Sequence, residues 1–174
     1  MMPTMLLALS VLSASPDPAG DEPSRHQLSV YLRSGAALYL SDARTQGGVG
    51  GGVGVRDTVD GRWVLQADVN GLTGLGSVLA VRVGAGLQRQ GVCSPAVMVN
   101  LTGLFGERLD FFIPAHPQSV AGPALGLGLT LAPVRFHLGR TQVSVLELGV
   151  GVGTDRPGLG LLYGLTLLEV GMTF

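Results

Sequence analysis

The stretch Leu167-Leu168-Glu169-Val170-Gly171-Met172-Thr173-Phe174 decides the fold class. Leu168, Val170, Met172 and Phe174 are apolar, and the residues between them are polar or small. A period of two is typical of a β-strand with one apolar face. The stretch stops on an aromatic residue, which is unusual because the ends of soluble domains generally fray. This ending is therefore atypical of a soluble domain.

The same alternation recurs along the chain, with no competing helical period. Phase changes at Pro133, near Val145-Leu146 and near Leu167-Leu168 predict β-bulges, and the Asp60-Gly61 pair predicts a hairpin turn. An even number of segments, most of them about 10–14 residues long, predicts an all-β, eight-stranded antiparallel up-and-down transmembrane barrel. The eight segments are 27–39, 48–56, 63–70, 79–88, 96–105, 125–137, 141–153 and 161–174.

The two faces of these segments differ in a way that bears on the surroundings of the barrel. One face carries Leu and Val, and the other carries Gly, Ser, Thr, Asn, Gln and isolated charges. A small soluble barrel has an apolar interior and a charged exterior. Strips of Gly suit a narrow polar lumen, whereas a continuous Leu/Val face suits lipid contact. A soluble periplasmic barrel that binds an apolar ligand is the alternative, and it requires the Leu/Val face to point inward.

Composition supports the membrane interpretation. Charged residues make up 13% of the chain, the net charge is −1, and 28 of 174 residues are Gly. No apolar run reaches the roughly 18 residues of a spanning helix. The near-neutral charge gives no electrostatic reason for nucleic-acid binding. Cys93 is the single cysteine, which excludes an internal disulfide and a cysteine metal cluster, and we expect no metal and no cofactor.

The N-terminal segment has the pattern of a secretory signal peptide. An apolar core from Met5 to Leu12 precedes the small residues Ser13-Ala14-Ser15. No basic residue precedes that core, and a buried N-terminal helix is the alternative. We expect residues 1–20 to be the signal peptide, with the cleavage site open, residues 21–25 to be a disordered lead-in, and residues 26–174 to form the barrel.

The terminal strand resembles the C-terminal strand of bacterial outer-membrane β-barrels, which ends in Phe after alternating apolar residues. Residues 26–174 as a whole resemble small barrels of the OmpA, OmpX and OmpW kind. The resemblance implies location in the bacterial outer membrane, contact with its lipid, and insertion by the barrel-assembly machinery. It also implies an assembly signal at Val170, Met172 and Phe174.

Charged residues share the polar face and are expected to form a network in the lumen. Unpaired charges are very costly in such an interior, so we expect ion pairs, above all between Asp68 and Arg82 on adjacent strands. The network serves either as an ion path or gate, or as a structural plug of salt bridges. Its expected members are Arg33, Arg56, Asp68, Arg82, Arg135, Glu147 and Glu169.

Aromatic residues are concentrated at the predicted strand ends, as in the interfacial girdles of membrane barrels. The resemblance implies that both chain ends are periplasmic, so we expect the single long connection, residues 106–122, to face outward. Its Phe111, Phe112 and His116 are candidates for a binding surface. The expected girdle consists of Tyr39, Trp63, Phe105, Phe136, Tyr163 and Phe174.

These features predict a non-enzymatic outer-membrane protein with a structural, surface-interaction or minor pore role. The alternative is an enzyme that modifies lipid A, which needs a nucleophilic Ser with His and an acid near the outer rim. The candidate for such a site is His116, which lies near Ser119 and Asp110 in a Pro-flanked stretch of the outer loop, and the alternative is that His116 is a solvated loop histidine.

Overall fold

The computed structural model describes residues 26–42, 44–107, 122–154 and 159–174. The expected signal peptide and lead-in lie outside these ranges, as do Phe111, Phe112 and His116. No helix in the described part is long and apolar enough to cross a membrane.

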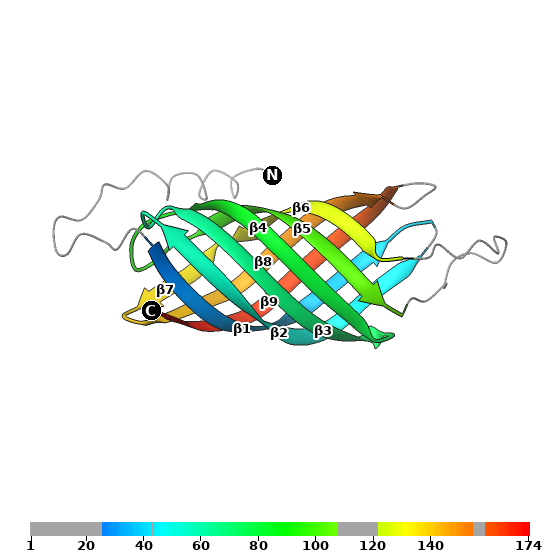
Figure 1. The fold of residues 1–174 in the computed structure, drawn as a ribbon, viewed down its shortest axis with the longest axis horizontal. Coiled ribbons are helices and arrows are strands. Elements are labelled where there is room, and N and C mark those ends of the chain that lie inside the picture. Colours follow the sequence, from blue (N-terminus) through cyan, green and yellow to red (C-terminus); the bar gives the residue numbers. More distant parts are fainter. Residues whose placement is uncertain (1–25, 43, 108–121, 155–158) are drawn as a thin grey trace, which may run out of the picture.

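Nine β-strands wrap into one closed antiparallel sheet (Figure 1). Sequence neighbours pair in order from β1 to β6, and β8 pairs with β9. The pairs β9–β1 and β6–β8 close the ring. β6 and β7 are two parts of one interrupted strand, so the molecule is an eight-stranded barrel. The strands are β1 (His26–Leu40), β2 (Thr45–Val59), β3 (Trp63–Leu75), β4 (Val78–Gln88), β5 (Ala96–Gly106), β6 (Ala124–Ala132), β7 (Val134–Leu138), β8 (Thr141–Thr154) and β9 (Leu159–Thr173).

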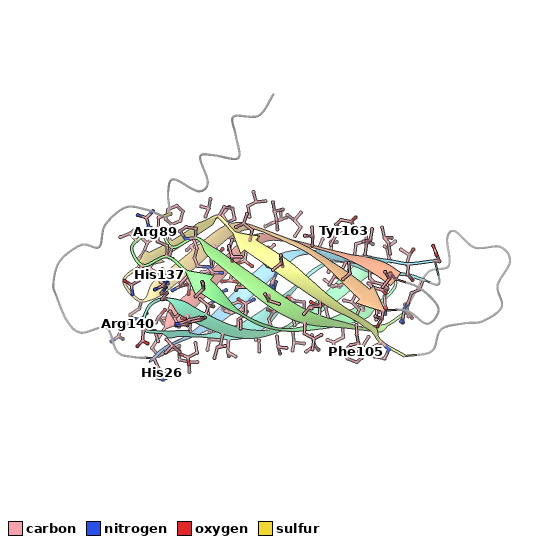
Figure 2. The ribbon with its side chains drawn as sticks, turned by 90° about the horizontal axis from the view of Figure 1, so that it is seen from above. His26, Arg89, Phe105, His137, Arg140 and Tyr163 are labelled. Atoms are coloured by element: carbon pink, nitrogen blue, oxygen red, sulfur yellow. The ribbon has the colours of Figure 1, made fainter. Side chains whose placement is uncertain are left out.

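The two ends of the barrel differ. The turn end holds both described chain ends, where the Phe174 N–H donates to the Leu28 carbonyl at 2.8 Å. It also holds the tight turn at Asp60-Gly61, whose φ values of 53° and 63° match the left-handed turn that an Asp-Gly pair favours. Figure 2 places His26, Arg89, His137 and Arg140 at this end. The other end, where β5 stops and β6 starts, is called the loop end below.

The predicted bulge at Pro133 is instead a break between β6 and β7. Proline has no N–H to donate to a sheet ladder, so the ladder stops at this residue. The connection between β4 and β5 closes the wall beside β7. There the Ser94 N–H donates to the Arg135 carbonyl and the His137 N–H donates to the Val92 carbonyl, each at 2.8 Å.

The other two predicted irregularities lie opposite each other in β8 and β9. Val145 pairs with Leu168 and Glu147 pairs with Thr166, so Leu146 and Leu167 are skipped together. Leu146 has φ of 62°, which is rare for a non-glycine residue. The alternation resumes after the skip. Glu147 points inward, and Leu146 and Leu148, on either side of Glu147, are exposed on the outer wall.

The Leu/Val face forms the outer wall, and the polar face forms the interior. Leucine and valine side chains of every strand are exposed around the barrel (Figure 2). In the described part, buried polar and charged side chains outnumber buried apolar ones. This arrangement inverts that of a soluble barrel. The soluble alternative required the Leu/Val face to point inward, and the structure places that face outward.

The aromatic prediction needs one correction. Trp63, Phe105, Phe136 and Tyr163 are exposed on the outer wall near strand ends, as a girdle requires. Tyr39 is also near a strand end, but it is 1% exposed and points into the lumen. Its ring lies over Gly153 and Gly160, where it leaves no room for a Cβ atom. The position of Tyr39 within the alternation, and not its nearness to the strand end, decides which way it points.

Candidate functional site

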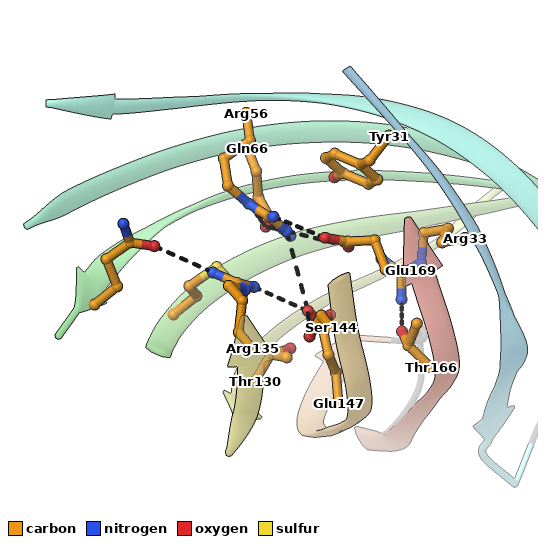
Figure 3. Close-up of polar contacts among 12 residues, drawn as sticks. Tyr31, Arg33, Arg56, Gln66, Thr130, Arg135, Ser144, Glu147, Thr166 and Glu169 are labelled. Carbon is orange, nitrogen blue, oxygen red and sulfur yellow. Dashed lines mark hydrogen bonds and ion pairs between the residues drawn. The ribbon is translucent and has the colours of Figure 1, made fainter. Parts of the chain in front are cut away.

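The seven charged residues expected in the lumen all point into it, and together they form what we call the charged cluster. They come from seven strands, and cross-barrel contacts connect them. Figure 3 shows the contacts around Arg56, Arg135 and Glu147. The cluster extends from the turn end to the middle of the lumen. It consists of Arg33, Arg56, Asp68, Arg82, Arg135, Glu147 and Glu169.

Arg56 and Glu169 form the most complete ion pair of the cluster. Arg56 donates from Nη1 to Glu169 Oε1 at 2.7 Å and from Nη2 to Oε2 at 3.1 Å. Gln66 Oε1 accepts a further bond from Arg56 Nη2 at 3.1 Å, and the guanidinium lies 4.7 Å from the centre of the Tyr31 ring. A two-pronged contact of this kind is the strongest arrangement of arginine with a carboxylate.

A second pair joins Arg135 and Glu147. Arg135 Nη2 donates to Glu147 Oε1 at 2.9 Å, and the Ser144 hydroxyl donates to the same oxygen at 3.1 Å. Glu147 also lies 4.0 Å from a nitrogen of Arg56 and 4.0 Å from a nitrogen of Arg82. This carboxylate therefore links the two parts of the cluster.

Asp68 is the centre of the third group. Its Oδ2 atom accepts from Tyr31 Oη at 3.1 Å, Arg33 Nη1 at 3.2 Å and Arg82 Nε at 2.9 Å. Its Oδ1 atom accepts from Asn70 at 2.7 Å. Asp68 and Arg82 are direct partners in the β3–β4 register, as expected of adjacent strands, and two arginines share this one carboxylate.

Neutral residues complete these groups, and the sequence prediction did not include them in the site. Tyr31, Gln66 and Asn70 supply the contacts described above, and the Thr166 hydroxyl accepts from Arg33. The alternation already placed Tyr31, Gln66 and Asn70 on the polar face. Adding every hydrogen-bonding side chain of that face would have found them, because buried charges need more partners than their counterions provide.

The lumen at the loop end has a different lining, which we call the apolar collar. The sequence prediction described the lumen as polar throughout and missed this region. The available signal was the pairing of adjacent apolar residues, such as Val78-Leu79 and Leu104-Phe105, which makes both faces apolar. The collar consists of Tyr39, Leu72, Val78, Ala80, Leu104, Ala124 and Leu162.

Polar contacts cover the collar at the loop end. Arg44 donates from Nη1 to the Gly122 carbonyl at 2.6 Å and from Nη2 to the Pro123 carbonyl at 3.2 Å. Its guanidinium lies 5.9 Å from the centre of the Tyr39 ring. Gln46 donates to the Gly106 carbonyl at 3.2 Å, which joins β2 to the end of β5.

A cavity of about 70 Å³ separates the collar from the charged cluster. Arg33, Asp68 and Arg82 line one side of it, and Leu72 and Leu162 line the side toward the collar. Elsewhere the wall is largely backbone, because Gly128, Gly149 and Gly164 are among the residues that line it.

The described residues offer little for catalysis or metal binding. They contain no group of three or more His, Cys, Asp or Glu residues that would hold a metal ion. Ser94 Oγ lies 2.7 Å from His137 Nδ1, but Ser94 is 1% exposed and no carboxylate within the described ranges contacts His137. This pair fixes the β4–β5 connection against β7. The predicted candidate His116, with Ser119 and Asp110, lies outside the described residues.

Comparison with known proteins gives a match in structure only. No protein-family model and no curated protein matches the chain. Neisserial surface protein A is similar with a TM-score of 0.55 at 10% identity, over 87% of this chain and 98% of that one. The N-terminal β-barrel domain of Pseudomonas aeruginosa OprF is similar with a TM-score of 0.49 at 12% identity, over 85% of this chain and 97% of that one. Ail of Yersinia pestis is similar with a TM-score of 0.48 at 13% identity, over 86% of this chain and 99% of that one. The chain has the fold of a small eight-stranded bacterial outer-membrane β-barrel.

Proposed function

We propose that this chain is a non-enzymatic integral protein of the bacterial outer membrane whose barrel is closed inside. Its role is structural or one of surface interaction, and it does not form an open pore. One observation carries the proposal: polar and charged side chains lie inside the barrel, and large apolar side chains cover its outside.

The outer wall supports the membrane part of the proposal. Apolar area exposed to water costs about 25 cal/mol per Å². Exposed leucines and valines cover the wall on every strand, with Val53 and Leu127 more than half exposed. A monomer in water rarely exposes so continuous an apolar surface, whereas lipid chains solvate it well.

The interior supports the closed part of the proposal. Arg56 and Arg135, two of the largest side chains inside, have no exposed surface. Met98 is also completely buried, and the collar closes the loop end around Leu104. Side chains therefore fill the lumen at two levels, in the charged cluster and in the apolar collar. This favours the charged residues as a structural plug of salt bridges over an ion path.

The assembly signal remains part of the proposal. Val170 and Met172 of β9, and Phe174 directly after it, are exposed on the outside of the barrel, where the barrel-assembly machinery would reach them during insertion. We also retain Phe111, Phe112 and His116 as candidates for contact with a surface partner. Their test is replacement of the 106–122 loop with Gly and Ser, followed by measurement of adhesion.

The decisive experiment combines fractionation, gel migration and conductance. The protein is extracted from outer-membrane fractions, and boiled and unboiled samples are compared on a semi-native gel. We expect a migration shift on boiling, and no stepwise conductance when the folded protein is added to a planar bilayer. Recovery in the soluble periplasm without a shift would overturn the membrane assignment, and steady open channels would overturn the closed lumen.

A further inference from the structure

The charged cluster does not balance its own charge. It contains four guanidinium groups, on Arg33, Arg56, Arg82 and Arg135, and three carboxylates, on Asp68, Glu147 and Glu169. All lie in the barrel interior, and none of the seven is more than 12% exposed in its side chain. An uncompensated charge is costly in such a place, so the surplus of one positive charge calls for a partner.

The surplus is located at Asp68. Arg56 has Glu169 and Arg135 has Glu147 as close partners, whereas Arg33 and Arg82 share Asp68. Both arginines, together with Tyr31, converge on the single oxygen Oδ2, so none of them has a carboxylate oxygen to itself.

Arg82 shows the deficit at the level of atoms. Its Nη2 atom is buried and makes no well-aligned hydrogen bond, although Asp68 Oδ2 lies 2.8 Å away. The next carboxylate oxygen, Glu147 Oε2, is 4.0 Å away and likewise has no hydrogen-bond partner. A guanidinium normally uses its five N–H groups in hydrogen bonds when it is buried.

The cavity of about 70 Å³ lies directly against these two arginines. A water molecule needs about 10–15 Å³ of such space, so the cavity has room for a small ion together with water. Asn70, Asn100 and Thr130 add polar groups to its lining. The volume excludes a nucleotide or a sugar.

We propose that this cavity binds one small monovalent anion, such as chloride, between Arg33 and Arg82. The anion supplies the fourth negative charge that the cluster lacks, and it fixes the two arginines where they share Asp68. The site is a structural ion site inside the plug. The inference rests on burial and charge within the barrel and holds whichever biological role the barrel has.

Chloride titration of the refolded protein in a zwitterionic detergent tests the proposal. Ionic strength is kept constant with gluconate, a sugar-sized anion that the cavity excludes, and the midpoint of thermal unfolding is followed by Trp63 fluorescence. We expect the midpoint to rise with chloride and to saturate, because a ligand that binds only the folded state stabilises it. Absence of a saturating rise in the wild-type protein would overturn the proposal.

Two variants remove the site in different ways. Arg82→Gln balances the cluster at three charges of each sign, so the barrel should fold and its chloride-dependent shift should be lost. Gly164→Val leaves every charge in place and fills the cavity, since a Cβ atom at Gly164 has no neighbour closer than 3.9 Å. It should also lose the shift. If both variants fold and retain the wild-type shift, the site is not in this cavity.

Arg62→Gln is the matched control, because it removes the same charge from an exposed position in the β2–β3 turn. It should keep the full chloride-dependent shift. If Arg62→Gln loses the shift as Arg82→Gln does, chloride acts through general screening, and the proposal is wrong. Migration on the semi-native gel reports separately whether each variant forms the barrel, so this test is independent of the proposed function.

Discussion

The charged cluster and the apolar collar close the same lumen by opposite means. In the cluster, Arg56 is held by directed contacts to Glu169 and Gln66. In the collar, Leu104 belongs to a cluster of apolar side chains that includes Leu72 and Leu162, which fill space without fixed directions. Each part of the cluster is therefore indispensable to its partner, whereas members of the collar are partly interchangeable.

This difference teaches how a narrow barrel tolerates charges inside. A buried ion pair often adds little net stability compared with a well-packed apolar pair. Losing one member is nevertheless costly, because the other is left unpaired in a poorly polarisable interior. We therefore expect substitutions in the cluster to have larger and more strongly coupled effects than substitutions in the collar.

The largest effect is expected for Glu169→Ala. It leaves the guanidinium of Arg56, which has no exposed surface, without its carboxylate. Breaking a buried pair from one side costs about 3–5 kcal/mol. Urea titration of the folded barrel, read by the fraction that migrates as folded on a semi-native gel, measures the loss. Glu107→Ala is the control, since Glu107 is exposed at the loop end and should lose less than about 1 kcal/mol. Equal losses in the two variants would contradict the distinction.

A smaller effect is expected for Leu104→Ala in the collar. Leu104 is 1% exposed, and truncation of a buried leucine costs about 2–5 kcal/mol. We expect a value near the lower limit, because the neighbouring apolar side chains have no fixed directions and can shift into part of the gap. Leu101→Ala on the same strand is the matched control: Leu101 faces outward, lipid or detergent fills the space, and only the transfer free energy is lost. A greater loss for Leu101→Ala would show that the collar is not tightly packed.

A still smaller effect is expected when both members of a pair are replaced. In the double variant Arg56→Met with Glu169→Leu, no buried charge is left without a partner. Such exchanges are often neutral, so we expect a loss of about 1 kcal/mol, well below that of Glu169→Ala alone. The same urea titration measures it. If the double variant is less stable than the single one, the directed contacts themselves, and not the cost of an unpaired charge, hold the cluster together.

The alternation in the sequence predicted much of this interior. It placed Arg33, Asp68 and Arg82 on one face, and the register of adjacent strands brought Asp68 opposite Arg82. Other contacts are beyond such reasoning. Arg56 on β2 reaches Glu169 on β9 across the intervening β1, and the curvature of the closed barrel, which no local pattern encodes, sets that distance.

The collar shows a second limit. Alternation says which face a side chain occupies, but not whether side chains from opposite walls meet. Leu72 and Leu162 meet in the lumen because the barrel is narrow enough for them to fill it. Pro133 shows a third limit, since the change of phase that it causes fits both a bulge and a break. The hydrogen bonds of the neighbouring β4–β5 connection decide between the two.

The smallest effect is expected for Tyr39→Ala, read as conductance. Tyr39 is the largest side chain of the collar, and its loss would open the lumen at the loop end if the collar were the only barrier. Arg56 and Arg135 remain completely buried at the other level, so the path stays closed. Planar-bilayer recording should therefore show no more channel openings for Tyr39→Ala than for the wild-type protein. Openings should appear only when Tyr39→Ala is combined with Glu169→Ala, because Arg56 then lacks the carboxylate that holds it in the lumen and both barriers are weakened. Frequent openings in Tyr39→Ala alone would assign the whole closure to the collar and leave the charged cluster with a purely structural role in the wall.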